Sequence, residues 1–287
     1  MSIENECMVV NLRISVWAGH RLDKEWSQDA TREAGAADDA ARVNKHLIPK
    51  KAFKTITSTS AAVRNHFYEH TLPWKDNGDR LLTRVMYTKF IEEHERLVGE
   101  FNTAVDTFLK RDYPAVVEQA SFHMGDLFNI ADYPAPQDLR AKFYMLLDID
   151  VVTEAGDFRV EMDQTETTAI QQGMQRAMEE RIGKAVRDVW ERLADVVSHF
   201  GDRMADKDKI FRNATITNLE ELVELLPALN VTEDPDLERL RLQVKAKLCG
   251  HEPDELRKDE IHRAAVAGEA AAIMEQMKGF MSAFGAK

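Results

Sequence analysis

Residues 163–200 read DQTETTAIQQGMQRAMEERIGKAVRDVWERLADVVSHF, and the spacing of apolar side chains in this stretch decides the expected fold class. Most of these side chains recur every three or four residues, which places them in one stripe along an α-helix. The stripe consists of Ile170, Met174, Met178, Ile182, Val186, Val189, Leu193, Val196 and Val197. No proline interrupts the stretch, so we predict one long amphipathic helix.

The same periodicity recurs on both sides of this stretch. It predicts further helices at residues 49–70, 79–111, 217–227, 235–248 and 253–284. Three segments rich in Val and Ile or flanking a Gly-containing turn are predicted strands, at 8–17, 143–152 and 157–162. We therefore predict a mainly α (α+β) protein, an elongated bundle of long amphipathic helices with a small three-stranded sheet. The chain is expected to form a single domain, 1–287, with the linker DYPAPQD at 132–138 as the place for a subdivision.

Composition supports a helical, cytoplasmic protein. The 287 residues include only 13 Gly and 8 Pro, while 31% are charged, which favours long solvated helices over a turn-rich β fold. Cys7 and Cys249 follow no metal-binding or disulfide pattern, as expected in a reducing compartment. We see no signal peptide, and no apolar run approaches the ~20 residues that cross a bilayer. We expect no membrane association.

The segment HFYEH, residues 66–70, matches the H-x-x-E-H spelling of one class of zinc protease. His66 and His70 would lie one helical turn apart, with Glu69 beside them as a base. A catalytic zinc needs a third protein ligand in a water-excluding site, and no downstream residue suggests one. Pro73 ends the helix just after His70, where a histidine complements the helix dipole. We therefore predict no metal here.

An acidic strand offers a second metal hypothesis. Asp148 and Asp150 in DIDVV point to one face of a strand, as a two-carboxylate nuclease site requires. Asp157, Glu161 and Asp163 follow nearby, but no lysine in this stretch could hold a nucleophilic water. We interpret the stretch as the solvated face of a sheet.

The strongest charge anomaly lies at residues 40–68. This segment contains no acidic residue, although the whole chain has a net charge of −12. Its cations are Arg42, Lys45, Lys50, Lys51, Lys54 and Arg64. With the rings of His46, Phe53, Phe67 and Tyr68 among them, they could form a track for single-stranded nucleic acid. They could also contact an acidic protein or a second copy, or simply balance carboxylates of the same chain.

A structural elbow is expected where the helix that begins at Pro49 meets Pro73. We predict that Trp74 is buried between the helices it separates and that Asp76 and Arg80 stabilise the turn. Gly78 supplies the conformational freedom that the turn needs. Trp17, Trp26 and Trp190 are likewise expected in the core or an interface.

No motif indicates an enzyme. G-x-x-x-x-G-K-[ST], G-x-G-x-x-G and G-x-S-x-G are all absent from the chain. Neither cysteine has an adjacent histidine that could activate it as a nucleophile. We predict a non-enzymatic protein without a cofactor.

Four blocks of the sequence resemble a family of unknown function carried mainly by tailed bacteriophages and prophages. They are HTLPWKDNGDRLL (70–82), GDLFNIADYPAPQDLRAKF (125–143), DFRVEMD (157–163) and ITNLEELVELLPALNVTEDPDLERL (216–240). The resemblance extends from about Val9 to Phe284; T-L-P-W, D-x-G and R-L-L belong to the family pattern, whereas H-x-x-E-H does not. Such proteins are commonly encoded near a MoxR-type AAA+ ATPase and a protein with a von Willebrand A domain.

The resemblance implies an adaptor for that ATPase, or a self-assembling scaffold, acting in the bacterial cytoplasm. The basic segment would then be the docking side. A single-strand-binding factor in phage DNA metabolism is the alternative, and a metal-dependent hydrolase is a more distant one.

Overall fold

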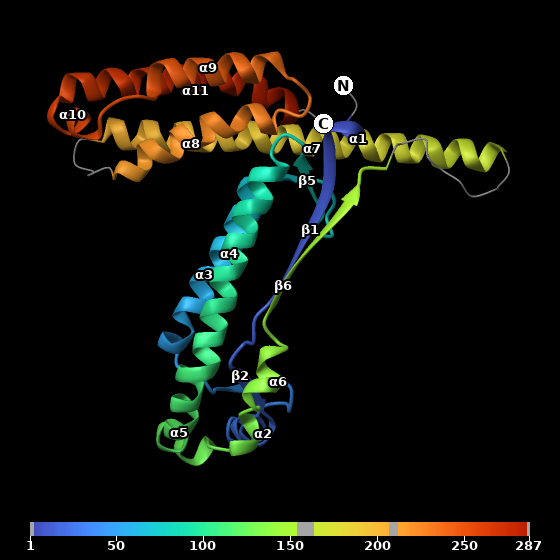
Figure 1. Ribbon diagram of the computed structural model, residues 1–287, viewed down its shortest axis with the longest axis vertical. Helices are drawn as coiled ribbons and strands as arrows, with labels where there is room; N and C mark the ends of the chain where they lie inside the picture. The colour runs from blue at the N-terminus through green and yellow to red at the C-terminus, as the bar shows by residue number, and fades with distance from the viewer. Residues whose placement is uncertain (1–2, 154–163, 207–211, 286–287) are drawn as a thin grey trace. The chain divides into compact units, whose positions relative to one another are not determined.

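The apolar stripe at 163–200 forms α7 (Gln164–Ala205), the longest helix of a computed structural model that describes residues 3–153, 164–206 and 212–285 (Figure 1). The mainly helical class is therefore confirmed. The chain groups into two compact units, each made of separate segments. Unit 1 comprises Met1–Asn11, His70–Lys89 and Asp148–Lys287; unit 2 comprises Leu12–Glu69 and Phe90–Leu147. Residues 132–138 lie inside unit 2.

Unit 1 is built on α7, which packs against three further helices (Figure 1). These are α8 (Asn213–Leu229), α9 (Pro235–Leu248) and α11 (Glu260–Gly285), with α10 (Pro253–Lys258) before the last. Trp190 is buried in this core, where its ring stacks on Phe280 and its Nε1 donates to Asp234, 3.1 Å away. The prediction for Trp190 is confirmed. The prediction of a single helix at 253–284 is wrong, because α10 ends at Lys258 and Asp259 begins α11 by accepting a hydrogen bond from the backbone N–H of His262.

Four strands of the described residues form the larger sheet. In spatial order they are β4 (Leu72–Pro73), β5 (Arg80–Thr83), β1 (Cys7–Ser15) and β6 (Tyr144–Val151), and α1 (Ile3–Glu6) precedes β1. β1 and β6 confirm two of the three expected strands, while residues 157–162 lie outside the described residues. The expected three-stranded sheet is wrong, because β4 and β5 join it and β5 pairs antiparallel with β1 from Cys7↔Thr83 to Val10↔Arg80.

The pairing of β5 also corrects the helix expected at 79–111. Leu81 and Leu82 are buried in the sheet rather than on a helix face. Helix α4 begins only at Tyr87 and ends at Thr107, followed by the π-helical turn η1 (Phe108–Asp112) and α5 (Tyr113–Met124). A short apolar run has no periodicity that separates a strand from a helix, and tertiary pairing decided it.

Unit 2 packs α3 (Lys50–Glu69) with η1 and the following helix α5 around one apolar core. Its remaining elements are the antiparallel strands β2 (His20–Asp23) and β3 (Val43–His46), with α2 (Lys24–Glu33) between them, then η2 (Gly125–Leu127), η3 (Ile130–Asp132) and α6 (Pro136–Arg140). The core contains a cluster of aromatic rings, with Phe53, Phe108, Tyr113 and Phe143 in ring contact. The bounds of α3 agree with the predicted 49–70, whereas α2 and the β2–β3 strand pair were not predicted.

Within the described residues, no helix is both long enough and apolar enough to cross a bilayer.

Candidate functional site

Helix α3 carries an exposed basic face, formed by Lys50, Lys51, Lys54 and Arg64. The opposite side of the helix is apolar and buried in unit 2, through residues such as Ile56, Val63 and Phe67. Burial of that side leaves the lysines and the arginine toward water. Among the residues predicted from sequence, these four therefore form a surface, which we call the α3 basic face.

Among the residues that the structure describes, the cations of this face have no partner. None of them forms an ion pair or a hydrogen bond through its side chain within the described part of the chain, and the same holds for the exposed Arg42 in the loop before β3. Arg96 on α4 shows the contrast, because it bridges Glu93 and Glu100. The α3 basic face thus presents uncompensated positive charge.

The position of the lysines on the helix adds to this charge. Lys50 and Lys51 occupy the first turn of α3, which contains no acidic residue. The amino end of a helix carries a partial positive charge, so cations there are unfavourable by roughly 0.3–1 kcal/mol each. The folded chain therefore keeps these lysines at a small cost in stability.

The rest of the molecule has the opposite charge. Unit 1 contains 23 Lys and Arg against 33 Asp and Glu, a net charge of −10, and unit 2 contains 15 against 17, a net charge of −2. The α3 basic face is therefore a local exception on an acidic chain.

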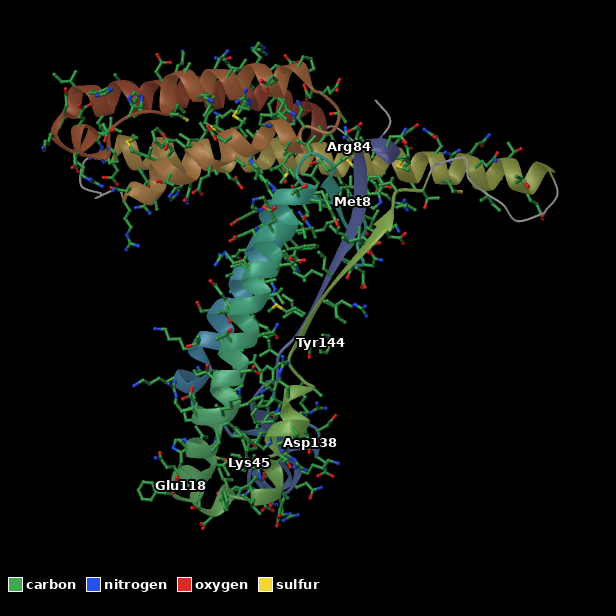
Figure 2. The ribbon with its side chains drawn as sticks, in the orientation of Figure 1. Met8, Lys45, Arg84, Glu118, Asp138 and Tyr144 are labelled. Carbon is green, nitrogen blue, oxygen red and sulfur yellow. The ribbon has the colours of Figure 1, made fainter. Side chains whose placement is uncertain are left out.

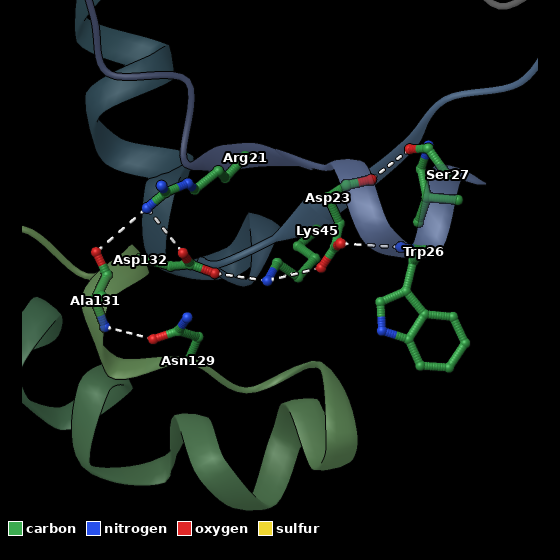
Figure 3. Close-up of polar contacts among 9 residues, drawn as sticks. Arg21, Asp23, Trp26, Ser27, Lys45, Asn129, Ala131 and Asp132 are labelled. Carbon is green, nitrogen blue, oxygen red and sulfur yellow. Dashed lines mark hydrogen bonds and ion pairs between the residues drawn. The ribbon is translucent and has the colours of Figure 1, made fainter. Parts of the chain in front are cut away.

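Lys45, by contrast, does not belong to an interaction surface (Figure 2). Its side chain is only 8% exposed, and its Nζ lies 2.7 Å from Oδ2 of Asp132 and 2.9 Å from Oδ2 of Asp23 (Figure 3). The prediction that Lys45 is a docking residue is wrong, because these two carboxylates compensate its charge inside unit 2. No local sequence pattern shows that Asp132 meets Lys45, since the two are far apart in the chain.

This buried ion-pair cluster connects the β2–β3 strand pair to η3. Asp132 also pairs with Arg21 at 2.8 Å, and Asp23 caps α2 by accepting from the backbone N–H of Trp26 (Figure 3). Pairing with Asp132, and then with Asp23, raises the pKa of Lys45, while the hydrogen bond from Lys45 lowers the pKa of Asp23. The cluster stabilises the fold around α3.

A shallow groove of about 630 Å³ runs along α3, α4 and η1 within unit 2. Small residues dominate its walls, among them Ala52, Thr55, Gly99 and Thr103. Its charged lining residues are Arg96, Glu100, Arg111 and Asp112, two cations and two carboxylates. Glu100 pairs with Arg96 and Asp112 pairs with Arg111, so the groove offers no net positive charge that would attract a nucleic-acid backbone.

Aromatic rings do not interleave with the cations as a stacking platform for bases requires. Phe67 is buried, and Phe53 packs against Trp17 and Phe108 in the core. Tyr68, 49% exposed, is the remaining ring of this segment at the surface of the helix. His46 is also exposed but lies on β3, so on α3 the aromatic part of the single-strand interpretation rests on Tyr68 alone.

The histidines of HFYEH point to different environments. His66 is buried, with Nε2 3.0 Å from the carbonyl oxygen of Phe90 and its ring stacked on that phenylalanine. His70 is half-buried and follows the end of α3. The described residues contain no group of three or more His, Cys, Asp or Glu side chains that could hold a metal ion.

The acidic strand is described only in part. Asp148 and Asp150 are exposed on β6, while Asp157, Glu161 and Asp163 lie outside the described residues.

The expected elbow is a β-turn region between β4 and β5. Trp74 is buried as predicted, with the guanidinium of Arg181 over its ring, but it does not separate two helices. Arg80 donates to the hydroxyl and carbonyl oxygens of Thr71, each at 2.7 Å, so its role in fixing this region is confirmed. Gly78 has a φ of +94°, which an L side chain rarely adopts.

Asp79, rather than Asp76, organises this turn. Asp76 has a 95% exposed side chain and contacts Lys184 at 3.4 Å. Asp79 accepts from Asn11 at 3.0 Å and from Asn77 at 3.2 Å. Burial alone would raise the pKa of Asp79, but these hydrogen bonds and the ion pair with Lys75 outweigh it, and the pKa is lowered. The prediction for Asp76 is wrong. Asp76 and Asp79 both lie in the turn, and only the hydrogen bond from the distant Asn11 shows that Asp79 is the one that stabilises it.

The two remaining tryptophans differ in burial. Trp26 is 46% exposed, so the expectation of a buried or interface anchor is not met within the chain, whereas Trp17 packs on Phe53 and Tyr113.

Cys7 and Cys249 are free thiols, and burial raises the pKa of each to about 11.

Comparison of the chain with protein-family models, with curated proteins and with solved structures found no match in any of the three.

Proposed function

We propose that the protein acts through protein–protein contacts rather than by catalysis, with the α3 basic face as a docking surface for an acidic partner. The observation that carries the proposal is the set of exposed, uncompensated cations on α3. Compensation by a partner's carboxylates would explain why Lys50 and Lys51 remain in the first turn of α3, where they oppose the helix dipole.

The chemistry beside this face favours a protein over nucleic acid. The neighbouring groove combines small side chains with two Arg–carboxylate ion pairs, so it offers no net positive charge to a phosphate backbone, and Tyr68 is the exposed aromatic ring on α3. A protein helix can approach small residues closely, whereas a single strand needs several rings for stacking and a path without carboxylates.

The identity of the partner is proposed on the sequence resemblance alone. Phage proteins with similar blocks are encoded near a MoxR-type AAA+ ATPase, and we propose that such an ATPase is a candidate partner in the host cytoplasm. Self-assembly is the other form that a contact through this face can take.

The test uses the full-length chain and two probes. Immobilised protein is presented with a purified MoxR-type AAA+ ATPase, and separately with a labelled single-stranded oligonucleotide in low-salt buffer. We expect retention of the ATPase, and at least tenfold weaker retention by a Lys50→Glu, Lys51→Glu, Lys54→Glu variant.

The matched control reverses three exposed lysines elsewhere, Lys24, Lys89 and Lys142, and should bind like the wild type. Tight oligonucleotide binding that weakens steeply with salt, and that is lost in the α3 variant, would replace this proposal by the nucleic-acid function.

A further inference from the structure

An acidic stripe on α7 complements the α3 basic face in charge and spacing. Glu191, Asp195 and Asp202 are exposed, and their positions place them within a narrow arc of one helix face. Their side chains form no ion pair or hydrogen bond within the described ranges. Unit 1, which contains this stripe, also carries most of the negative charge of the chain.

The two sets of charges repeat at the same distance. Lys54 and Arg64 are ten residues apart, or ~15 Å along a helix axis, at 1.5 Å per residue. Glu191 and Asp202 are eleven residues apart, or ~16 Å. Two helices packed side by side could therefore form both ion pairs at once.

The order of the charges selects the direction of packing. In an antiparallel arrangement Asp202 lies opposite Lys54, and Glu191 lies opposite Arg64. The same register brings the exposed Arg187 of α7 opposite Glu69, the acidic residue at the end of α3. A parallel arrangement would place Arg187 beside the lysines instead. In antiparallel packing the partly positive amino end of each helix also lies beside the partly negative carboxyl end of the other, which is favourable.

We infer that the acidic partner of the α3 basic face is a second copy of this chain, whose α7 packs antiparallel against α3 through Glu191, Asp195 and Asp202. The inference rests on the proposed function and specifies the occupant of the same surface. Because the contact depends on exposed charges, it weakens as salt shortens the Debye length from ~10 Å at 0.1 M toward ~3 Å at 1 M.

A charge-swap experiment tests it. Variant A carries Lys54→Glu and Arg64→Glu, and variant B carries Glu191→Lys and Asp202→Lys. Native mass spectrometry and sedimentation velocity are recorded for the wild type, for each variant and for an equimolar mixture, at low and high salt. All four side chains are exposed, so circular dichroism should be unchanged.

The wild type should form a species of two or more copies at low salt and dissociate at high salt. Each variant alone should show at least a tenfold higher dissociation constant, because like charges then face each other. The mixture should restore association as a species with one A and one B chain. A control with Lys24→Glu and Lys142→Glu should associate like the wild type.

A wild-type protein that stays at the mass of one chain, or a mixture that fails to restore the A·B species, would overturn the inference. Neither result would decide the proposed function, because a different protein could still occupy the α3 basic face. That broader proposal fails only if residue 54 contacts no protein at all.

Discussion

Removal of the Lys45 side-chain charge should destabilise unit 2 selectively. In a Lys45→Met variant, Asp132 and Asp23 remain as carboxylates with 5% and 12% exposed side chains and lose the cation between them. Breaking a buried ion pair by removal of one partner costs roughly 3–5 kcal/mol. Arg21 still pairs with Asp132, so we expect the low end, a loss of about 3 kcal/mol in the free energy of unfolding.

Hydrogen exchange followed by mass spectrometry can assign this loss to a part of the molecule. A loss of about 3 kcal/mol corresponds to amides that exchange roughly 100-fold faster in β2, α2 and β3. Amides of α7 and α11 in unit 1 should keep their wild-type rates. Lys51→Met, at an exposed site without a partner in the described chain, serves as the control and should change stability by less than ~0.5 kcal/mol.

The effect of Lys45→Met should also depend on pH with a definite sign. Lys45 lowers the pKa of Asp23, whose ordinary value is 3.8, so the stability from this pair is present above that value and lost as the pH falls through the lowered pKa. The loss in the free energy of unfolding caused by Lys45→Met should therefore be larger at pH 7 than at pH 3. A loss no larger than that caused by Lys51→Met, or faster exchange spread equally over both units, would refute the argument.

Three further predictions concern buried polar groups. The Tyr133 hydroxyl is buried without a hydrogen-bond partner in the described chain, so Tyr133→Phe should be neutral or stabilising in urea unfolding. The control Tyr113→Phe removes a 2.7 Å hydrogen bond to the carbonyl oxygen of Pro134 and should lower the free energy of unfolding by about 0.5–1.5 kcal/mol. Burial, and then the charge of His66, lowers the pKa of His94, so the unfolded chain binds the proton more strongly and stability falls as the pH drops below about 6.5; His94→Leu should flatten unfolding curves measured from pH 8 to 5. Asp79→Ala should lower the thermal midpoint by loss of about 1–3 kcal/mol, whereas Asp76→Ala should leave it unchanged.

Local signals predicted some helix boundaries and missed others. α9 begins and ends at the predicted residues because Asp234 caps it and Pro235 occupies its first turn, both of which are visible in the sequence. The end of α8 was placed at Pro227, yet the helix continues to Leu229, since a proline in the last turn removes few backbone bonds.

Contacts between distant residues could not be predicted. The sequence of β5 is compatible with the start of a helix, and only its pairing with β1 makes it a strand. The sequence around Lys45 is as basic as the first turns of α3, and only the contacts with Asp23 and Asp132 show that its charge is compensated. The α3 basic face was predicted because it needs only a charge run and a helical period. Its lack of internal partners became visible only with the side chains in place.

The most direct test of the central claim is photo-crosslinking at position 54 of the α3 basic face. A photoreactive amino acid replaces Lys54 in the full-length chain, and irradiation in the expressing cells is followed by separate protease and nuclease digestion of the adduct. Position 142 of the same unit serves as the control site.

We expect a discrete adduct at position 54 that protease removes and nuclease does not. The adduct should disappear when Lys50 and Lys51 are changed to Glu, although both changes should stabilise α3 slightly by complementing its dipole. A nuclease-sensitive adduct, or equal labelling at positions 54 and 142, would contradict the account.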